Sequence, residues 1–352
     1  MAPYDPFQRG RYPVGVRALH AHDAARARDF PCEIWYPAEA RYASRDLSPE
    51  TQDSFTTSPD TAPRTQQAVR DAAACPGTYP LVVFSHHSGG NRRAATFLCT
   101  HLSSHGYVTA ALDHSEVIAP ELAPSFAENS RQKIALARLW AANRVADVRF
   151  LLDRLLGGET WEPAVRLDGD SAGIVGHSFG GWTALAAPDT EPRIAAVVAL
   201  APGGNSRPRP GIIRSPLAFA WLRAVPTLYL AAADDVPIPL EGVYELFDLT
   251  PAAKRMAVLR RADHLHFVDN VAEAHESMRK RLLTGELSWI SEKMRPIAEL
   301  CPPEQAHNFV RGLTLSHLDA TLRQFADAQQ FLAGDLAREL ALRGINAFIH
   351  PR

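Results

Sequence analysis

The sequence contains little of what marks a membrane protein or a nucleic-acid-binding protein. No apolar run approaches the ~20 residues of a membrane span, and the start, MAPYDPFQRGRYPVG, lacks the apolar core of a signal peptide. The formal net charge is only −2, so no global field attracts nucleic acid or an anionic membrane. We therefore expect a cytoplasmic protein with no nucleic acid partner and no membrane span, and its oligomeric state stays open.

Cysteine is also scarce. The four cysteines are scattered and form no Cys-x-x-Cys pair, which predicts free thiols and excludes a typical zinc site; they are Cys32, Cys75, Cys99 and Cys301. Hydrophobic residues make up 46% of the chain and charged residues 22%, the balance of a globular protein with a large core. We expect neither a cofactor nor a metal.

Apolar runs alternate with segments of helical periodicity along most of the chain. This alternation predicts an α/β protein whose mostly parallel central sheet has helices on both faces. An antiparallel N-terminal hairpin is predicted from two segments rich in β-branched and aromatic residues, Tyr12 to His20 and Phe30 to Tyr36. The buried strands that we expect to form the sheet are Leu81 to Phe84, Tyr107 to Leu112, Ala172 to Val175, Ile194 to Leu200, Val225 to Ala232 and Arg255 to Leu259.

No linker divides the chain, so we interpret residues 1–352 as a single domain with additions. Residues 37–79 are poor in large aliphatic side chains and predict a polar loop excursion. Residues 268–303 predict a helical insertion that resembles a lid. The apolar positions from Phe309 to Leu342 predict a long amphipathic helix over the sheet.

The segment around Ser178 combines a glycine pattern with a strand before it and a helix after it. Gly176 and Gly180 stand two residues before and two after the serine. Gly-x-Ser-x-Gly in this context is the nucleophile elbow, where a sharp turn leaves no room for a Cβ at the glycines. The pattern predicts Ser178 as a catalytic nucleophile.

An acyl-transfer site also needs a base and a carboxylate that orients it. Ser178, Asp235 and His264 follow one another in the order Ser, acid, His, each just after a predicted strand. Asp234 stays an alternative acid, because composition and periodicity do not separate the two. His266 stays an alternative base, and His264 is preferred because it follows its strand more closely.

The developing oxyanion needs two main-chain N–H donors. We expect them from Phe179, just after the nucleophile, and from Ser88 in the turn that follows Leu81 to Phe84. We expect His86 and His87 to shape that turn. The cluster Asp263-His264-x-His266-x-x-Asp269 also permits a metal interpretation, but no complementary ligand set accompanies it.

With these residues in view, the chain resembles the α/β-hydrolase superfamily, and within it the platelet-activating-factor acetylhydrolase-like and dienelactone-hydrolase-like carboxylic ester hydrolases. The segments that carry the resemblance are PVGVRALHAHDAARARDFPCEIWYP, LVVFSHHSGG, GYVTAALDH, GHSFGG and ADHLHF. In related sequences the acid stands four residues before a proline, which favours Asp235 because of Pro239. The chain differs at His87, where the subgroup often has glycine. It also differs at Ala201 to Gly204: the acetylhydrolases take their catalytic acid from this position, after the strand that follows the elbow helix, but this segment contains no carboxylate.

The resemblance and the triad order together predict a serine hydrolase that cleaves small-molecule carboxylic esters through an acyl-enzyme. A thioesterase, lactonase or amidase with the same triad is an alternative. A non-catalytic α/β-hydrolase scaffold that serves as a binding module is another.

Overall fold

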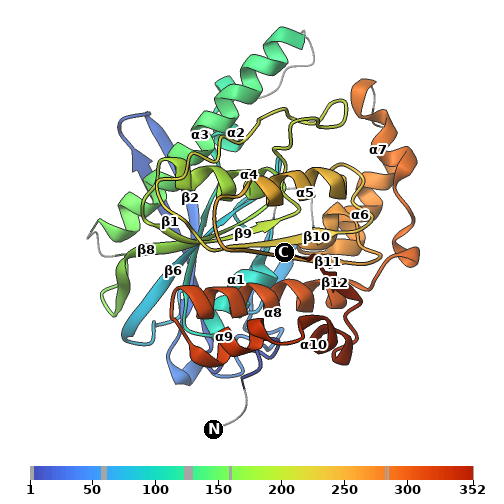
Figure 1. Ribbon diagram of the computed structural model, residues 1–352. Coiled ribbons are helices and arrows are strands. Elements are labelled where there is room, and N and C mark those ends of the chain that lie inside the picture. Colours follow the sequence, from blue (N-terminus) through green and yellow to red (C-terminus); the bar gives the residue numbers. More distant parts are fainter. Residues whose placement is uncertain are drawn as a thin grey trace.

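The computed structural model describes residues 4–56, 62–122, 130–157, 161–281, 283 and 285–351. The described residues form a ten-stranded sheet in the order β12-β11-β10-β9-β8-β6-β7-β2-β1-β5 (Figure 1). Its strands are β1 (Val14–Asp23), β2 (Arg28–Pro37), β5 (Val69–Arg70), β6 (Gly77–Ser85), β7 (Val108–Leu112), β8 (Val165–His177), β9 (Ile194–Leu200), β10 (Thr227–Ala232), β11 (Lys254–Leu259) and β12 (Ala347–Ile349).

The six strands from β7 to β11 in this order are mutually parallel, and the strands that flank them, β2 and β12, pair antiparallel with them. β1 and β2 pair as an antiparallel hairpin that joins the sheet at β7, so the predicted N-terminal hairpin is confirmed. At the other edge β12 pairs antiparallel with β11. The mostly parallel sheet predicted from the apolar runs is thus confirmed, with β12 added.

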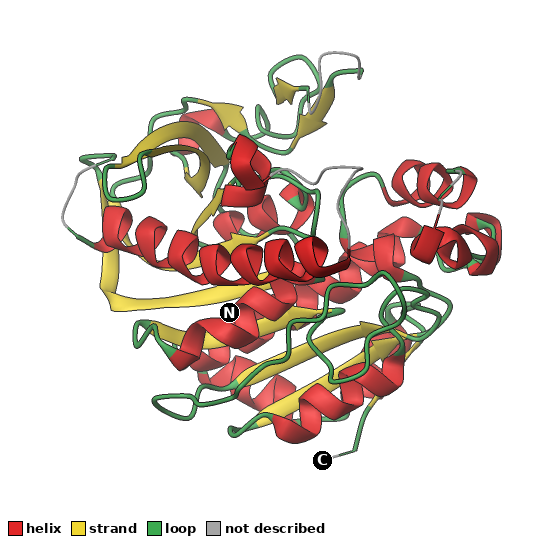
Figure 2. Ribbon diagram, turned by 90° about the horizontal axis from the view of Figure 1, so that it is seen from above, coloured by secondary structure: helices red, strands yellow, loops and turns green. Residues whose placement is uncertain are grey.

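Helices cover both faces of the sheet (Figures 1 and 2). Side chains of β9 alternate between the two faces: Val198 belongs to the core beneath α1 and α8, and Val197 to the core beneath α3, α4 and α5. This two-sided burial is why the strand reads as one apolar run. The helices are α1 (Thr96–Ser104), α2 (Ser115–Ile118), α3 (Ser130–Leu156), α4 (Phe179–Ala186), α5 (Leu240–Leu249), α6 (Val271–Lys280), α7 (Ser288–Lys293), α8 (Pro303–Thr321), α9 (Ala326–Ala333) and α10 (Leu336–Leu342).

Two sequence predictions differ from the structure. The single helix expected between residues 309 and 342 is three helices, because the chain turns at Gln324, which has a positive φ, and leaves the helical conformation again at Gly334, which is extended. Residues 37–79 contain more than loop, since β3 (Asp53–Phe55) and β4 (Arg64–Gln66) form a small hairpin and β5 pairs with β1. No helix within the described residues is both long and apolar enough to cross a bilayer.

Candidate active site

The site lies where the parallel strands end. β6, β8, β10 and β11 run in one direction, so the loops that follow them share one edge of the sheet. These loops carry the residues singled out in the sequence. Ser88 follows β6, Ser178 follows β8, Asp235 follows β10 and His264 follows β11.

Ser178 occupies a strained turn between β8 and α4. Its φ is 59° and its ψ −114°, a backbone conformation that residues other than glycine rarely adopt. A Cβ on Gly176 would lie 2.0 Å from the Gly180 carbonyl oxygen, and a Cβ on Gly180 would lie 1.9 Å from the Ser85 carbonyl oxygen. Both glycines are therefore required by the close approach of the backbone, and the turn leaves Ser178 half-buried at the start of α4.

Asp235 and His264 are in contact. Nδ1 of His264 lies 2.8 Å from Oδ2 of Asp235, while Oδ1 of Asp235 accepts a hydrogen bond of 2.7 Å from the Ile238 N–H. The Asp235 side chain is 2% exposed and that of His264 12%. Asp234 instead points outward, where its carboxylate pairs with Arg295 at 3.4 Å. Of the two candidate acids, the structure brings Asp235 to the histidine.

This pairing sets the proton affinity of the imidazole. Burial alone would lower the pKa of His264, but the charge of Asp235 and its hydrogen bond outweigh burial, so the pKa of His264 lies above its usual value. A carboxylate in this position also holds the imidazole in one orientation. The pair therefore has the properties of a base and the residue that orients it.

His266 has a different environment. It is fully buried, its Nδ1 accepts a hydrogen bond of 3.0 Å from the Asp263 N–H, and its Nε2 lies 3.3 Å from the Cys301 carbonyl oxygen. Asp269 caps α1 by accepting hydrogen bonds from the N–H groups of Thr96 and Phe97. The side chains of the sequence cluster thus point in different directions.

Asp263 joins the two loops that carry Asp235 and His264. Its Oδ1 accepts hydrogen bonds from the His264 N–H at 2.6 Å and from the Val236 N–H at 2.9 Å. Because one carboxylate oxygen holds both loops, the chain segments that carry Asp235 and His264 keep a fixed spacing.

Two further imidazoles lie beside His264. The ring of His177 is 4.7 Å from that of His264, and the ring of His87 is 5.3 Å from that of His177, measured between centroids. Burial, together with the neighbouring His264 and Arg144, lowers the pKa of His87 to about 4, and burial also keeps the pKa of His177 well below its usual value. Both stay neutral at neutral pH, so His264 is the imidazole of this cluster that can gain a proton.

The His177 contact also locates His264 relative to Ser178, since His177 and Ser178 are adjacent. Among the described residues no hydrogen bond joins the Ser178 hydroxyl to His264 or to His266. Catalytic hydrogen bonds are often long in a free enzyme and shorten when substrate binds.

The turn after β6 lies against the elbow. The Gly90 N–H donates to the His87 carbonyl oxygen at 3.0 Å and Gly89 has a φ of 70°, which together define a turn with a glycine at its third position. Ser88 stands at the exposed second position of this turn. The Phe179 N–H belongs to the first turn of α4, where helix N–H groups have no intrahelical partner. Both expected oxyanion donors thus belong to segments that meet where Gly180 packs on Ser85.

A second Ser-His-Asp arrangement, which the sequence did not reveal, lies beneath this turn. The Ser85 hydroxyl is 2.8 Å from Nε2 of His114, and Nδ1 of His114 is 3.1 Å from Oδ2 of Asp147. All three side chains are almost completely buried. His86 is buried beside them, with its Nδ1 2.7 Å from the His87 carbonyl oxygen and its Nε2 accepting from the His114 N–H, so it shapes the turn as expected.

Comparison with known proteins adds a family likeness. Residues 58–146 match the family model described as platelet-activating factor acetylhydrolase, isoform II. The platelet-activating factor acetylhydrolase of Canis lupus familiaris is 28% identical over 155 residues, which is 35% of this chain and 34% of that protein. That of Cavia porcellus is 25% identical over 226 residues, 54% of this chain and 48% of that protein. The matched region thus spans at most about half the length of these relatives.

A solved structure with a similar fold covers nearly the whole chain. The ferulic acid esterase from Streptomyces cinnamoneus superposes with a TM-score of 0.64 at 24% identity, covering 92% of this chain and 93% of that one. The chain therefore has the α/β-hydrolase fold, as predicted. In sequence it resembles the platelet-activating factor acetylhydrolases.

Proposed function

We propose that this protein is a serine hydrolase that cleaves small-molecule carboxylic esters through an acyl-enzyme intermediate. The observation that carries the proposal is the combination of a strained Ser178 with an Asp235-paired His264 on the adjoining loop. A strained, half-exposed serine at a helix start has no structural purpose that a glycine would not serve better.

The mechanism follows from the chemistry of each group. His264 takes the proton of the Ser178 hydroxyl as the oxygen attacks the ester carbonyl, and Asp235 stabilises the imidazolium that forms. The N–H groups of Phe179 and Ser88 donate to the oxyanion. His264 then protonates the departing alcohol, and water repeats the same steps on the acyl-enzyme.

The choice of an ester rests on the relatives. Both curated relatives are named as acetylhydrolases, and the matched family model has the same name. The family-model match, residues 58–146, includes the turn that carries Ser88, and the fold as a whole resembles that of an esterase. The same triad also serves thioesters, lactones and amides, which only a substrate panel separates.

The direct test is a series of p-nitrophenyl esters from acetate to palmitate, assayed with the wild-type protein and with Ser178→Ala. We expect hydrolysis by the wild type and its loss in the variant, with fluorophosphonate labelling confined to Ser178. Full hydrolysis by Ser178→Ala would reject the proposal. A wild-type protein that is folded, hydrolyses no member of the panel and is not labelled would favour a binding scaffold.

We also propose that residues 268–303 cover the site as a lid on a single-domain enzyme. The support is local: α6 carries His275, whose Nδ1 lies 3.7 Å from Oδ2 of Asp263, the residue behind the base. Limited proteolysis before and after acylation tests this. We expect acylation to protect this segment, and equal cleavage rates would argue against a lid.

A cytoplasmic location is a further proposal, supported by four cysteines that are all free. Fractionation of the source cells tests it, since we expect the protein beside cytoplasmic markers. Recovery from the medium or periplasm would contradict it.

A further inference from the structure

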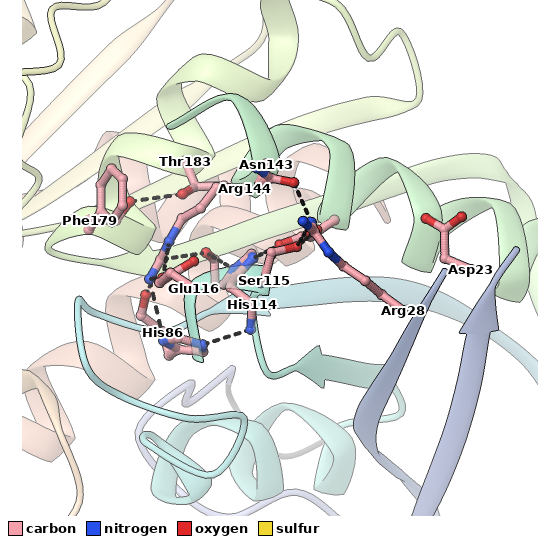
Figure 3. Close-up of polar contacts among 12 residues, drawn as sticks. Asp23, Arg28, His86, His114, Ser115, Glu116, Asn143, Arg144, Phe179 and Thr183 are labelled. Carbon is pink, nitrogen blue, oxygen red and sulfur yellow. Dashed lines mark hydrogen bonds and ion pairs between the residues drawn. The ribbon is translucent and has the colours of Figure 1, made fainter. Parts of the chain in front are cut away.

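One arginine of α3 is buried completely beneath the proposed site. Arg144 is 0% exposed, and a fully buried charge is rare because removing it from water costs several kcal/mol unless it is paired. Its guanidinium forms an ion pair with Glu116 of α2 (Figure 3). The Nε donor reaches Oε1 of Glu116 at 2.8 Å.

The other donors of Arg144 reach the turn after β6. One guanidinium nitrogen donates to the His86 carbonyl oxygen (Figure 3). Another donates to the His87 carbonyl oxygen at 3.3 Å. The His87 carbonyl oxygen also accepts from Nδ1 of His86 at 2.7 Å and from the Gly90 N–H at 3.0 Å. Three donors therefore converge on a single carbonyl oxygen.

That carbonyl belongs to the peptide bond whose N–H is the Ser88 donor. A trans peptide is planar and its C=O and N–H point in opposite directions, so holding the His87 oxygen also sets the direction of the Ser88 N–H. Hydrogen bonds to a peptide oxygen polarise the whole unit and strengthen its N–H as a donor. Arg144 thus influences both the aim and the strength of this N–H.

Arg144 also contacts the residue that carries the other donor. Its guanidinium carbon lies 4.4 Å from the centroid of the Phe179 ring, within the range of a cation–π interaction. Figure 3 shows the Phe179 ring and the His86 turn on either side of this guanidinium. One buried side chain therefore touches both segments from which the oxyanion donors are expected.

We propose that Arg144 is a positioning residue for the oxyanion hole, which it assembles by fixing the His87–Ser88 peptide against Phe179. The inference rests on the proposed function. Arg144 acts through the N–H groups of Ser88 and Phe179 and itself touches no reacting atom. Its charge is paired with Glu116, and it sets the direction and polarisation of the Ser88 N–H before substrate binds.

The test compares Arg144→Lys with Arg149→Lys on the same helix. A lysine keeps the charge but has no planar fork with which to bind Glu116 and two carbonyl oxygens together. Arg149 bonds to the Thr190 carbonyl oxygen and to Glu191, so the control makes the same chemical change away from the turn. Each variant is assayed for kcat, for KM, and for inhibition by phenylboronic acid, which forms a tetrahedral anion on the serine.

We expect Arg144→Lys to lower kcat by about 10- to 100-fold, somewhat less than the loss of a whole oxyanion donor. Affinity for phenylboronic acid should fall in parallel, whereas KM should stay within about twofold, because only the tetrahedral anion uses the hole fully. Arg149→Lys should resemble the wild type. A folded Arg144→Lys with unchanged kcat and boronate affinity, or with a raised KM alone, would overturn the proposal.

Glu116→Gln provides a second route if Arg144→Lys does not fold. This variant keeps Arg144 and a hydrogen-bond acceptor but removes the opposing charge, so we expect a smaller, parallel loss of kcat and boronate affinity. Unchanged values in a folded Glu116→Gln would then decide against the proposal.

Ser178→Ala in the same assays distinguishes failure of the proposed function from failure of the positioning role. If Ser178→Ala stays active, the proposed function fails. If Ser178→Ala is inactive while Arg144→Lys has normal activity, only the positioning role of Arg144 fails.

Discussion

Two Ser-His-Asp sets occur among the described residues, and their serines, Ser85 and Ser178, lie at the ends of the neighbouring strands β6 and β8. The two sets differ in hydrogen bonding and in exposure. In the buried set, Ser85, His114 and Asp147 are joined by hydrogen bonds throughout. In the open set the acid and the base are joined, and Ser178 stands half-exposed on a strained turn.

Their surroundings explain the difference. Asp147 accepts further hydrogen bonds from the Ser115 N–H and hydroxyl and pairs with Arg26. Burial alone would raise the pKa of Asp147, but these bonds and His114 hold it below its usual value. The buried set is a satisfied polar network that fixes loops, while the open set holds a half-exposed serine on a strained turn. The residue types alone therefore do not make a catalytic triad.

The largest contrast is expected at the two serines. Ser178→Ala should lower kcat by about 10⁴- to 10⁶-fold, because the nucleophile and its base act as a unit. Its fold should persist, since alanine removes a single hydroxyl. Kinetics on p-nitrophenyl acetate with circular dichroism measure both effects, and a loss of activity that accompanies unfolding would leave the catalytic contrast unproven.

Substitution of the two neighbouring acids, Asp235 and Asp234, should affect kcat differently. Asp235→Asn should lower kcat by about 10³- to 10⁴-fold, because the amide does not stabilise the imidazolium and favours the wrong tautomer. Asp234→Asn is the matched control and should stay near wild type. Equal losses in the two variants would mean that the acid was assigned wrongly.

Asp147→Asn should instead lower the free energy of unfolding. Removing one partner of a buried ion pair costs about 3 kcal/mol or more, which denaturant titration will detect. The activity of the remaining folded protein should lie within about tenfold of wild type. A catalytic loss as large as that of Asp235→Asn would make the buried set part of the mechanism.

The dependence of kcat/KM on pH should report the protonation of His264 in the open set. His264 must be neutral to accept a proton, so kcat/KM has its full value at a pH above the pKa of His264 and falls as the pH drops below that pKa. The pKa of His264 is raised, which places this acid limb above the usual imidazole value of 6.5. In Asp235→Asn the largest raising influence on the pKa of His264 disappears, while burial and the smaller effect of the Asp263 charge remain, so the limb should move to lower pH. An unchanged limb would assign it to another group.

The smallest effect is expected for Ser85→Ala. The lost hydrogen bond to His114 should lower the free energy of unfolding by about 1 kcal/mol, with little change in kcat. Thermal unfolding beside Ser178→Ala measures it. Fluorophosphonate labelling of Ser85 would remove the distinction between the sets.

Much of the architecture was predictable because it depends on local patterns. The apolar runs of β9 and the central strands located the sheet, since strands buried on both faces must be apolar throughout. The short edge strand β12 was missed because three partly buried residues, AFI, form no distinctive pattern. The break between α8 and α9 was missed because the spacing of apolar residues continues across it. The backbone leaves the helical conformation at Gln324, where φ is positive.

The sequence by itself located the sharp turn at Ser178, the proposed nucleophile, since the glycines around this serine constrain the backbone locally and an apolar strand precedes them. It also determined that Ser178, Asp235 and His264 each follow a strand of the sheet, in that order. Only the tertiary structure decided that Asp235 faces His264 while Asp234 faces Arg295. The direction of a side chain beyond a strand end depends on how its loop packs against distant segments, and no local pattern encodes that. For the same reason, no periodicity could show that Arg144 is buried beneath the turn that carries Ser88.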